Sequence, residues 1–323
     1  MAFTLTTTKK ALEIYYKMIK IGIIGMSEGN AHPTSWSAII NGTFNAEEIV
    51  ALGYPAVANY LQANKATLGL PAAKVTHILT QDKALSAHIA RTAGIASICE
   101  TAEEMISAVD AVLLCRDDPE NHREMARPFI DAGIPIFIDK PLCDSLEDLK
   151  YFAAEVAKGK FIMSCSSQRY AGEYMAVKQD LVNLGKLELI TAVGVKDWTK
   201  YGVHMLEGIL SLLDDAKPLS VINVGREDAH IVKIDFEGGL QVTVHLMMHI
   251  SGTFQVSVFG QKGWRMLEIK NSYAQFRDNI IEFIRSVQEG KPRLEFAKTE
   301  QIIKTLIAGN DSLKQGGKKI IIN

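Results

Sequence analysis

Residues 19–25 read Ile-Lys-Ile-Gly-Ile-Ile-Gly, a short and mostly apolar, β-branched run that ends in glycine. Such a run predicts a strand buried on both faces, as in a parallel sheet covered by helices. Further strands are expected at residues 75–79, 111–114 and 135–138, with helix-like segments between them. Because strands and helices alternate over short turns, the sequence predicts a doubly wound parallel sheet, a Rossmann-type fold, in the N-terminal part.

The pattern changes further along the chain, where apolar residues recur at every second position. The clearest run places Leu240, Val242, Val244, Leu246, Met248 and Ile250 on one face, and Gln241, Thr243, His245, Met247 and His249 on the other. One apolar and one mixed face predict a large, open, mostly antiparallel sheet. The expected fold class is therefore α/β plus α+β. The expected domains are an N-terminal extension (1–18), a Rossmann domain (19–142) and a substrate-binding and oligomerisation domain (143–323) with helices that pack back on the first.

The amino-acid composition indicates which classes of partner the protein binds. Lys and Arg total 35 against 37 Asp and Glu, so no strong field favours nucleic acid or a membrane, and a small molecule is expected. No apolar run approaches the ~20 residues that cross a bilayer, and no signal-peptide pattern is present. The four cysteines are scattered without metal-ligand spacing, so no metal site is expected. These features predict a cytoplasmic protein.

The loop after the first strand stands where a Rossmann fold has its phosphate loop. There the backbone approaches a pyrophosphate closely at a helix N-terminus. The loop reads Gly25-Met26-Ser27-Glu28-Gly29-Asn30 instead of Gly-x-Gly-x-x-Gly, with Ser27 and Asn30 at the second and third glycine positions. Taken alone, it leaves a plain strand-to-helix turn as open an interpretation as a dinucleotide site.

Later motifs strengthen the dinucleotide interpretation. They are Pro119-Glu120-Asn121-His122, Asp139-Lys140-Pro141, Arg169-Tyr170, Gly202-Val203-His204 before a helix expected at 205–213, Phe259–Gly263 and Gly290–Pro292. A lysine and proline that end a parallel strand lie at the carboxyl edge of the sheet, where ligands bind. In order and spacing, from Ile19 to Ile322, these motifs resemble the Gfo/Idh/MocA family of nicotinamide-dependent oxidoreductases, relatives of glucose–fructose oxidoreductase and inositol dehydrogenase.

The resemblance implies catalytic roles for two residues. Lys140 would lie between the nicotinamide ribose and the substrate hydroxyl, and His204 would be the general acid/base that takes the hydroxyl proton. An imidazole suits that task because its ordinary pKa is near neutral pH. The chain departs from the family at Lys200, where relatives often carry an aspartate, and in the short connection from Val195 to His204.

Binding residues follow from the same resemblance. Substrate contacts are expected at Arg169, Tyr170, Asp197, Trp198, Lys200 and Tyr201. Cofactor contacts are expected at Gly25, Met26, Ser27, Gly29, Asn30, Thr80, Asp82, Arg116, Pro119, His122, Asp139 and Lys140. Together with Lys140, Lys196 and Lys200 could make the pocket cationic and favour an anionic substrate. The favoured interpretation is that both of these lysines point to water.

Both NAD and NADP remain open as the cofactor. An acidic residue at the end of the second strand binds the adenosine ribose of NAD. Counting back from Gly94 puts the neutral Thr80 there, and Lys83 nearby favours NADP, whereas Asp82 would reverse the choice after a small change in register.

The expected function is an NAD(P)-dependent oxidoreductase that acts on a secondary alcohol or ketone of a sugar, polyol or related small molecule. A non-catalytic dinucleotide- or sugar-binding sensor is the alternative, because of Lys200 and the degenerate glycine loop. A lyase or hydrolase that uses the cofactor for transient oxidation is a third possibility. The uncharged mixed face with Thr243, His245, Met247 and His249 predicts a homodimer or homotetramer.

Overall fold

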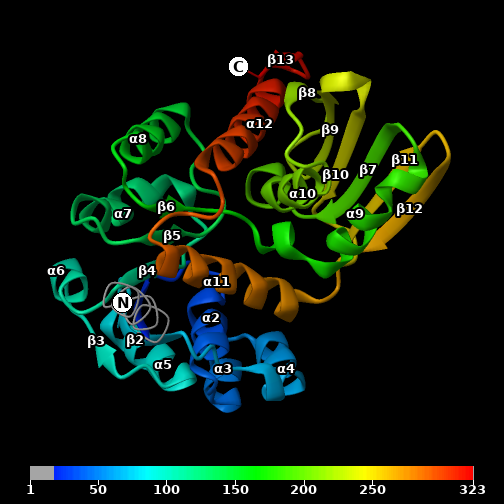
Figure 1. The fold of residues 1–323 in the computed structure, drawn as a ribbon. Helices are drawn as coiled ribbons and strands as arrows, with labels where there is room; N and C mark the ends of the chain where they lie inside the picture. The colour runs from blue at the N-terminus through cyan, green and yellow to red at the C-terminus, as the bar shows by residue number, and fades with distance from the viewer. Residues whose placement is uncertain (1–17, 323) are drawn as a thin grey trace, which may run out of the picture.

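The computed structural model describes residues 18–322, which fold around two sheets (Figure 1). Within these residues, the first sheet has six parallel strands in the order β3-β2-β1-β4-β5-β6, and the second has seven in the order β12-β11-β7-β10-β9-β8-β13. This arrangement confirms the predicted fold class. The extension predicted for residues 1–18 lies, except for Met18, outside the described residues.

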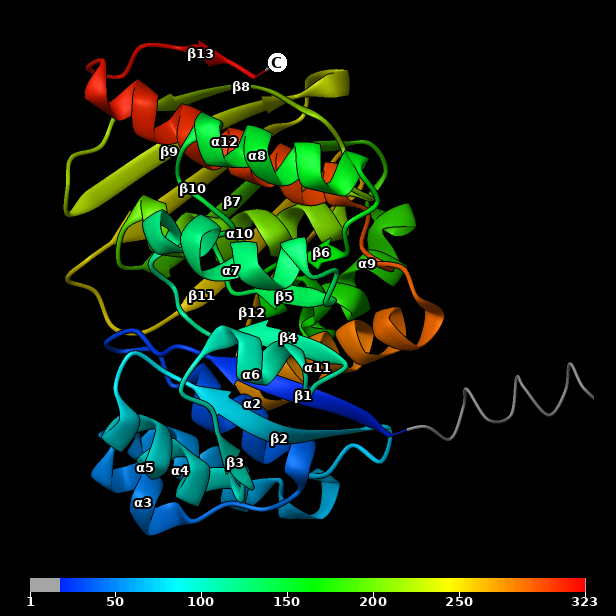
Figure 2. The same cartoon turned by 90° about the vertical axis from the view of Figure 1, so that its left-hand side faces the viewer.

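The first sheet is built around β1 (Ile19–Ile24), which pairs with β2 (Ala73–Leu79) and β4 (Ala111–Leu114). Ile21 and Ile24 belong to two different hydrophobic clusters, because helices cover both faces of the sheet (Figures 1 and 2). The remaining strands are β3 (Ser97–Ile98), β5 (Ile136–Ile138) and β6 (Ile162–Met163). Because β6 pairs with β5, this sheet extends past the domain boundary expected at Leu142.

Local caps fix several helices around this sheet. The side chains of Asp82, Thr101 and Ser145 accept backbone N–H groups at the starts of α5, α6 and α8. Gly94 ends α5 in the left-handed conformation at φ 62°, as its position in the sequence predicts. The helical segments of this part are α2 (His32–Asn41), α3 (Ala46–Ala51), α4 (Pro55–Ala63), η1 (Lys65–Thr67), α5 (Lys83–Ala93), α6 (Ala102–Ile106), η2 (Pro119–Asn121), α7 (His122–Asp131) and α8 (Leu146–Ala157).

In the second sheet, buried and partly exposed side chains alternate as predicted, but the alternation stops where each strand ends. In β10 (Gln241–Met247), Val242, Val244 and Leu246 are buried, and the intervening residues face the partly exposed side. The strand ends at Met247, so the prediction that Met248 and Ile250 continue the buried face is wrong: both are exposed. His249 lies in the turn that follows. The other strands are β7 (Leu187–Val195), β8 (Pro218–Asn223), β9 (Ala229–Phe236), β11 (Phe254–Gly260), β12 (Gly263–Glu268) and β13 (Ile320–Ile321).

The helices of the second part connect the two sheets. Helices α9, α10 and α12 lie against the apolar face of the second sheet (Figure 1). Phe283 of α11 joins the cluster that contains Ile21, and Ile303 of α12 joins the cluster that contains Ile24. The bounds are η3 (Ser167–Tyr170), α9 (Gly172–Leu184), α10 (Trp198–Leu212), η4 (Glu237–Gly239), α11 (Ser272–Glu289) and α12 (Phe296–Lys314). No helix within residues 18–322 has the length and apolarity needed to cross a bilayer.

Candidate active site

A cavity of about 310 Å³ lies between the two parts of the chain, beside the carboxyl ends of β1, β4 and β5. Ligands of doubly wound sheets bind at this edge. Its N-terminal lining comprises Gly29, Asn30, Ala31, His32, Ser35, Ala56, Val57, Tyr60, Asp117 and Lys140. Its C-terminal lining comprises Ser167, Gln168, Tyr201, His204, Phe254, Ser272, Gln275 and Phe276. Lys140 and His204, far apart in sequence, thus share one cavity.

Lys140 follows β5 and is almost fully buried. Its Nζ lies 3.6 Å from Oδ2 of Asp117, which follows β4. The preceding residue, Asp139, accepts hydrogen bonds from Asn30 Nδ2 at 2.8 Å and from the backbone N–H of Lys140 at 2.8 Å. Two strand ends and the glycine loop therefore hold the lysine in place.

His204 stands on α10 with aromatic neighbours. Its ring meets those of Tyr201 and Phe254 at centroid distances of 5.0 and 5.9 Å. Its Nδ1 lies 2.6 Å from the hydroxyl oxygen of Ser166. Burial, and then the positive charge of Lys140, lower the pKa of His204 well below its ordinary value. The ring is therefore neutral at neutral pH and able to accept a proton.

The glycine loop leaves room for a dinucleotide phosphate. Gly25 and Gly29 have φ values of 71° and 77°, and no atom lies within 4 Å of the position that a Cβ would take at Gly29. The hydroxyl of Ser35 in α2 is buried beside the cavity, next to the phenol of Tyr60. Open space beside Gly29, directly before a helix N-terminus, fits an anionic ligand such as the pyrophosphate.

Two other residues of the glycine loop, Met26 and Ser27, form hydrogen bonds within the protein. The side-chain amide of Gln81 accepts from the backbone N–H of Met26 at 3.4 Å and donates to its carbonyl at 2.5 Å. Ser27 Oγ donates to Oδ1 of Asp117 at 2.5 Å. Both residues therefore shape the loop through protein contacts.

The residues after β2 are engaged in a similar way. Asp82 caps α5 by accepting from the backbone N–H of Leu85 at 2.7 Å, and Thr80 Oγ1 donates to the carbonyl of Asp82 at 2.7 Å. Lys83, on which the preference for NADP depends, forms an exposed ion pair with Glu100.

Three expected cofactor contacts after β4 have structural partners instead. Arg116 forms an ion pair with Asp118, and Pro119 is buried in η2. His122 is fully buried, with Nδ1 3.0 Å from the carbonyl of Leu142 and Nε2 3.0 Å from that of Arg116. His122 ties the loop after β4 to the segment after Lys140, and its contact with a cofactor stays a prediction.

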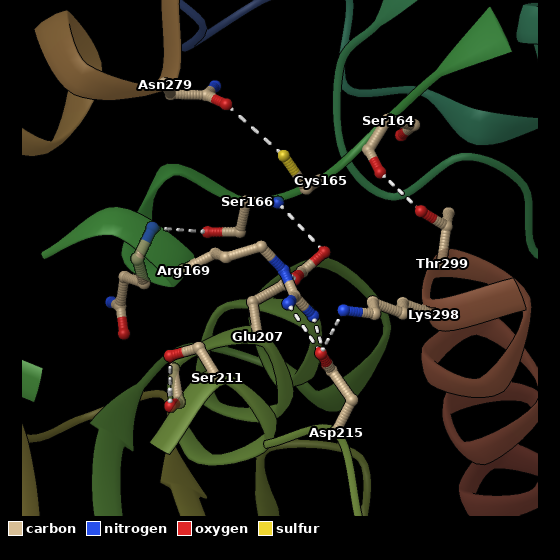
Figure 3. Close-up of polar contacts among 12 residues, drawn as sticks. Ser164, Cys165, Ser166, Arg169, Glu207, Ser211, Asp215, Asn279, Lys298 and Thr299 are labelled. Atoms are coloured by element: carbon tan, nitrogen blue, oxygen red, sulfur yellow. Dashed lines mark hydrogen bonds and ion pairs between the residues drawn. The ribbon is translucent and has the colours of Figure 1, made fainter. Parts of the chain in front are cut away.

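The predicted substrate residues Arg169 and Tyr170 do not reach the cavity. Arg169 Nε lies 2.5 Å from Oε2 of Glu207, and its Nη2 lies 2.9 Å from Oδ1 of Asp215 (Figure 3). Arg169 and Tyr170 instead line a larger hollow, of about 880 Å³, whose lysines and arginines are mostly paired with neighbouring carboxylates. The adjacent residues Ser167 and Gln168 line the smaller cavity.

The segment before His204 also differs from the prediction. Asp197 caps α10 by accepting from the backbone N–H of Lys200 at 2.9 Å, so this helix begins at Trp198 and not near Met205. Trp198 is fully buried and donates from Nε1 to the carbonyl of Leu306 at 2.9 Å. Of Asp197, Trp198, Lys200 and Tyr201, only Tyr201 lines the cavity.

Several lining residues were missed in the sequence. His32, Gln168 and Gln275 carry polar groups into the site, and Phe254 supplies an aromatic wall. His32 stands directly before Pro33 at a helix start, a local sign that it faces the loop. Within the described residues, no group of three His, Cys, Asp or Glu side chains is arranged to hold a metal ion.

Comparison with known proteins gives one family match and one curated relative. Residues 19–166 match the model of an oxidoreductase family with an NAD-binding Rossmann fold, GFO_IDH_MocA. A putative UDP-kanosamine synthase oxidoreductase subunit from Amycolatopsis mediterranei is 28% identical over 127 residues, or 33% of this chain. The match covers 36% of that relative, so the chain matches about a third of its length.

Solved structures share the fold over almost the whole chain. GenD2 from gentamicin A biosynthesis, in complex with NAD, is 16% identical with a TM-score of 0.75, covering 95% of this chain and 97% of that one. Myo-inositol dehydrogenase from Lactobacillus casei, in complex with NAD(H) and myo-inositol, is 16% identical with a TM-score of 0.76 and the same two coverages. At this identity, the likeness establishes the fold.

Proposed function

We propose that the chain, whose residues 19–166 match the oxidoreductase family GFO_IDH_MocA, moves a hydride between a nicotinamide dinucleotide and a secondary alcohol or ketone. The observation that carries this proposal is the shared cavity of Lys140 and His204 at the carboxyl edge of the first sheet. One residue comes from each part of the chain, so a substrate between them would meet an acid/base and a cation at the same oxygen.

In the proposed oxidation, His204 accepts the hydroxyl proton of the substrate. Its lowered pKa keeps the imidazole neutral before the reaction. Lys140 donates a hydrogen bond to the same oxygen and stabilises the negative charge that develops there. A nicotinamide dinucleotide, when bound, would supply the hydride acceptor.

The residues that would hold the dinucleotide are those of the glycine loop. Gly29 leaves open space where the backbone could approach the pyrophosphate, and the first turn of α2 begins directly after this loop. We infer that NAD is the preferred cofactor, because residues 19–166 match a family with an NAD-binding Rossmann fold and Lys83 is paired with Glu100. Tighter binding of NADP⁺ than of NAD⁺, measured by calorimetry, would reverse this choice.

The proposed substrate class is a polyol or a sugar derivative. Gln168 Oε1 is a buried atom of the cavity wall without a hydrogen-bond partner among the described residues, and a substrate hydroxyl would satisfy such a group. Two similar proteins, a myo-inositol dehydrogenase and a putative UDP-kanosamine synthase oxidoreductase subunit, are named for compounds of the same class. The buried free thiols of all four cysteines favour a reducing compartment such as the cytoplasm.

A screen of purified protein tests the proposal. NAD⁺ is added with separate polyols, aldoses and amino sugars, and the absorbance of NADH is followed over time. We expect at least one compound to reduce NAD⁺ faster than a blank without substrate. Binding of NAD⁺ without reduction by any compound would instead favour the sensor.

A further inference from the structure

Two hydrogen bonds fasten Ser166 to the helix that carries His204. The Ser166 hydroxyl oxygen lies 2.6 Å from Nδ1 of His204, and the Ser166 backbone N–H donates to Oε1 of Glu207 at 3.2 Å. His204 and Glu207 lie about one turn apart on α10 and so share a helix face. Ser166 itself is fully buried in the segment between β6 and η3. The last strand of the first sheet is thereby tied to the proposed acid/base.

Glu207 is held in turn by a buried charge network. Its side chain is 1% exposed, and its second oxygen pairs with Arg169 Nε at 2.5 Å. Arg169 also pairs with Asp215, and Lys298 Nζ lies 3.1 Å from the same carboxylate (Figure 3). Two cations thus balance two carboxylates. This balance allows the Glu207 carboxylate to remain buried and to fix the backbone of Ser166.

The chemistry of a hydroxyl suits a partner of an acid/base. A serine hydroxyl can accept a hydrogen bond from Nδ1–H or donate one to an unprotonated Nδ1, whereas a carboxylate can only accept. The backbone N–H of Gln168 donates to the same Ser166 oxygen at 3.2 Å and limits its movement. We propose that Ser166 is a positioning residue that holds the His204 imidazole in one orientation before and after the ring takes up a proton. This inference rests on the proposed function of His204.

The other described groups around His204 do not form a hydrogen bond that would orient its ring. The charged and titratable groups that face the ring are Lys140 and Asp139 after β5, His32 on α2 and Lys196 after β7. The rings of Tyr201 and Phe254 cover other sides. Among the hydrogen bonds of the described residues, Ser166 is the partner of the His204 ring. The serine therefore orients the imidazole without adding a negative charge beside it.

Substitution of Ser166 tests the proposal with a readout that needs no substrate. The pKa and nitrogen chemical shifts of His204 are followed by NMR in the free protein for the wild type, Ser166→Ala and Ser166→Thr. Loss of the hydroxyl removes the acceptor for the Nδ1–H of the imidazolium, so we expect Ser166→Ala to lower the His204 pKa by up to about one unit. Ser166→Thr, which keeps a hydroxyl, should restore the wild-type titration.

Kinetics give the second readout. Ser166→Ala should lower kcat about tenfold, move the acid limb of the kcat/KM profile to lower pH, and leave the KM for NAD⁺ unchanged. Ser164→Ala is the matched control, because Ser164 is similarly buried on the same segment and its carbonyl, not its side chain, accepts the bond from Thr299. This control should retain wild-type kcat and His204 titration.

Unchanged His204 shifts and pKa in folded Ser166→Ala would overturn the proposal. If that variant does not fold, Ser166→Cys replaces it, because this change nearly keeps the side-chain volume and weakens the hydrogen bond. Ser166→Cys should also lower the His204 pKa, and an unchanged pKa in this variant would equally overturn the proposal. A shifted pKa in a protein without dehydrogenase activity would refute the proposed function and leave the positioning of the ring intact.

Discussion

His32 Nδ1 lies 2.5 Å from Oδ2 of Asp139, so the helix after the glycine loop is joined to the strand end that carries Lys140. The His32 ring also stacks on Trp36 at a centroid distance of 4.4 Å. Asp139 is 1% exposed and pairs with His32, Asn30 and the backbone N–H of its neighbour Lys140. These contacts fix the cavity on the side of the first sheet.

The state of Asp139 predicts how stability responds to acid. Burial alone would raise its pKa, but the charge and hydrogen bond of His32 and the charge of Lys140 outweigh burial and hold the pKa at about 2, against an ordinary 3.8. Because the folded value is the lower one, the stabilisation is fully present above about pH 4 and is lost as the pH falls through 2. It amounts to roughly 2 kcal/mol.

Urea unfolding at several pH values checks this prediction. We expect the free energy of unfolding of the wild type to fall more steeply below pH 4 than that of Asp139→Asn. Equal slopes for the two proteins would show that Asp139 is not held as a carboxylate by these contacts.

The buried pair of Arg169 and Glu207 predicts a large loss of stability. Glu207→Ala leaves one contact of a buried guanidinium unmade and should cost about 3–5 kcal/mol. Lys178→Ala is the control, because its partner Asp214 is 84% exposed, and it should cost about 0–1 kcal/mol. Urea unfolding compares the two variants, and similar losses would contradict the assignment of a structural role to Arg169.

Lys200 provides a test of the substrate's charge. Its backbone N–H is bound by Asp197, and the side chain does not line the cavity, so Lys200→Ala should keep kcat and KM within about twofold of the wild type. Tyr201→Ala, which removes a cavity wall beside His204, should raise the substrate KM. A tenfold rise of KM in Lys200→Ala, measured by steady-state kinetics, would point to an anionic substrate.

The partly exposed face of the second sheet predicts self-association. It includes Thr243 and His245, and at its edge Phe259, Trp264 and Met266 are 37%, 60% and 65% exposed. Apolar side chains grouped on an open sheet favour a protein partner, and we expect a homodimer or homotetramer. Light scattering should show Met266→Asp shifted toward monomer with an unchanged circular dichroism spectrum. A monomeric wild type at micromolar concentration would contradict this.

Local signals predicted much of the fold. The buried run of β1, the left-handed Gly94 and the alternation of β10 each depend on a few neighbouring residues. The start of α10 also has a local signal, because Asp197 caps this helix by accepting from the backbone N–H of Lys200. Family motifs gave Lys140 and His204, which do share a cavity.

The rest of the site depends on tertiary contacts, which the sequence does not show. Ser166 meets His204 across 38 residues, and His32 meets Asp139 across 107, so no local pattern joins them. Arg169 has the type and sequence position of a ligand contact, yet its partners Glu207 and Asp215 turn it away from the cavity. Whether a charged residue is paired within the protein becomes visible only in the folded chain.

The kcat of Lys140→Ala and His204→Ala, followed by the absorbance of NADH with a substrate from the screen, tests the central claim most directly. We predict that each variant loses about 10²–10⁴-fold in kcat, because a positioned acid/base and a charge on the reacting oxygen are removed. The affinity for NADH, measured by fluorescence, should stay within a few-fold of the wild type for both variants. Wild-type kcat in both would contradict the catalytic assignment.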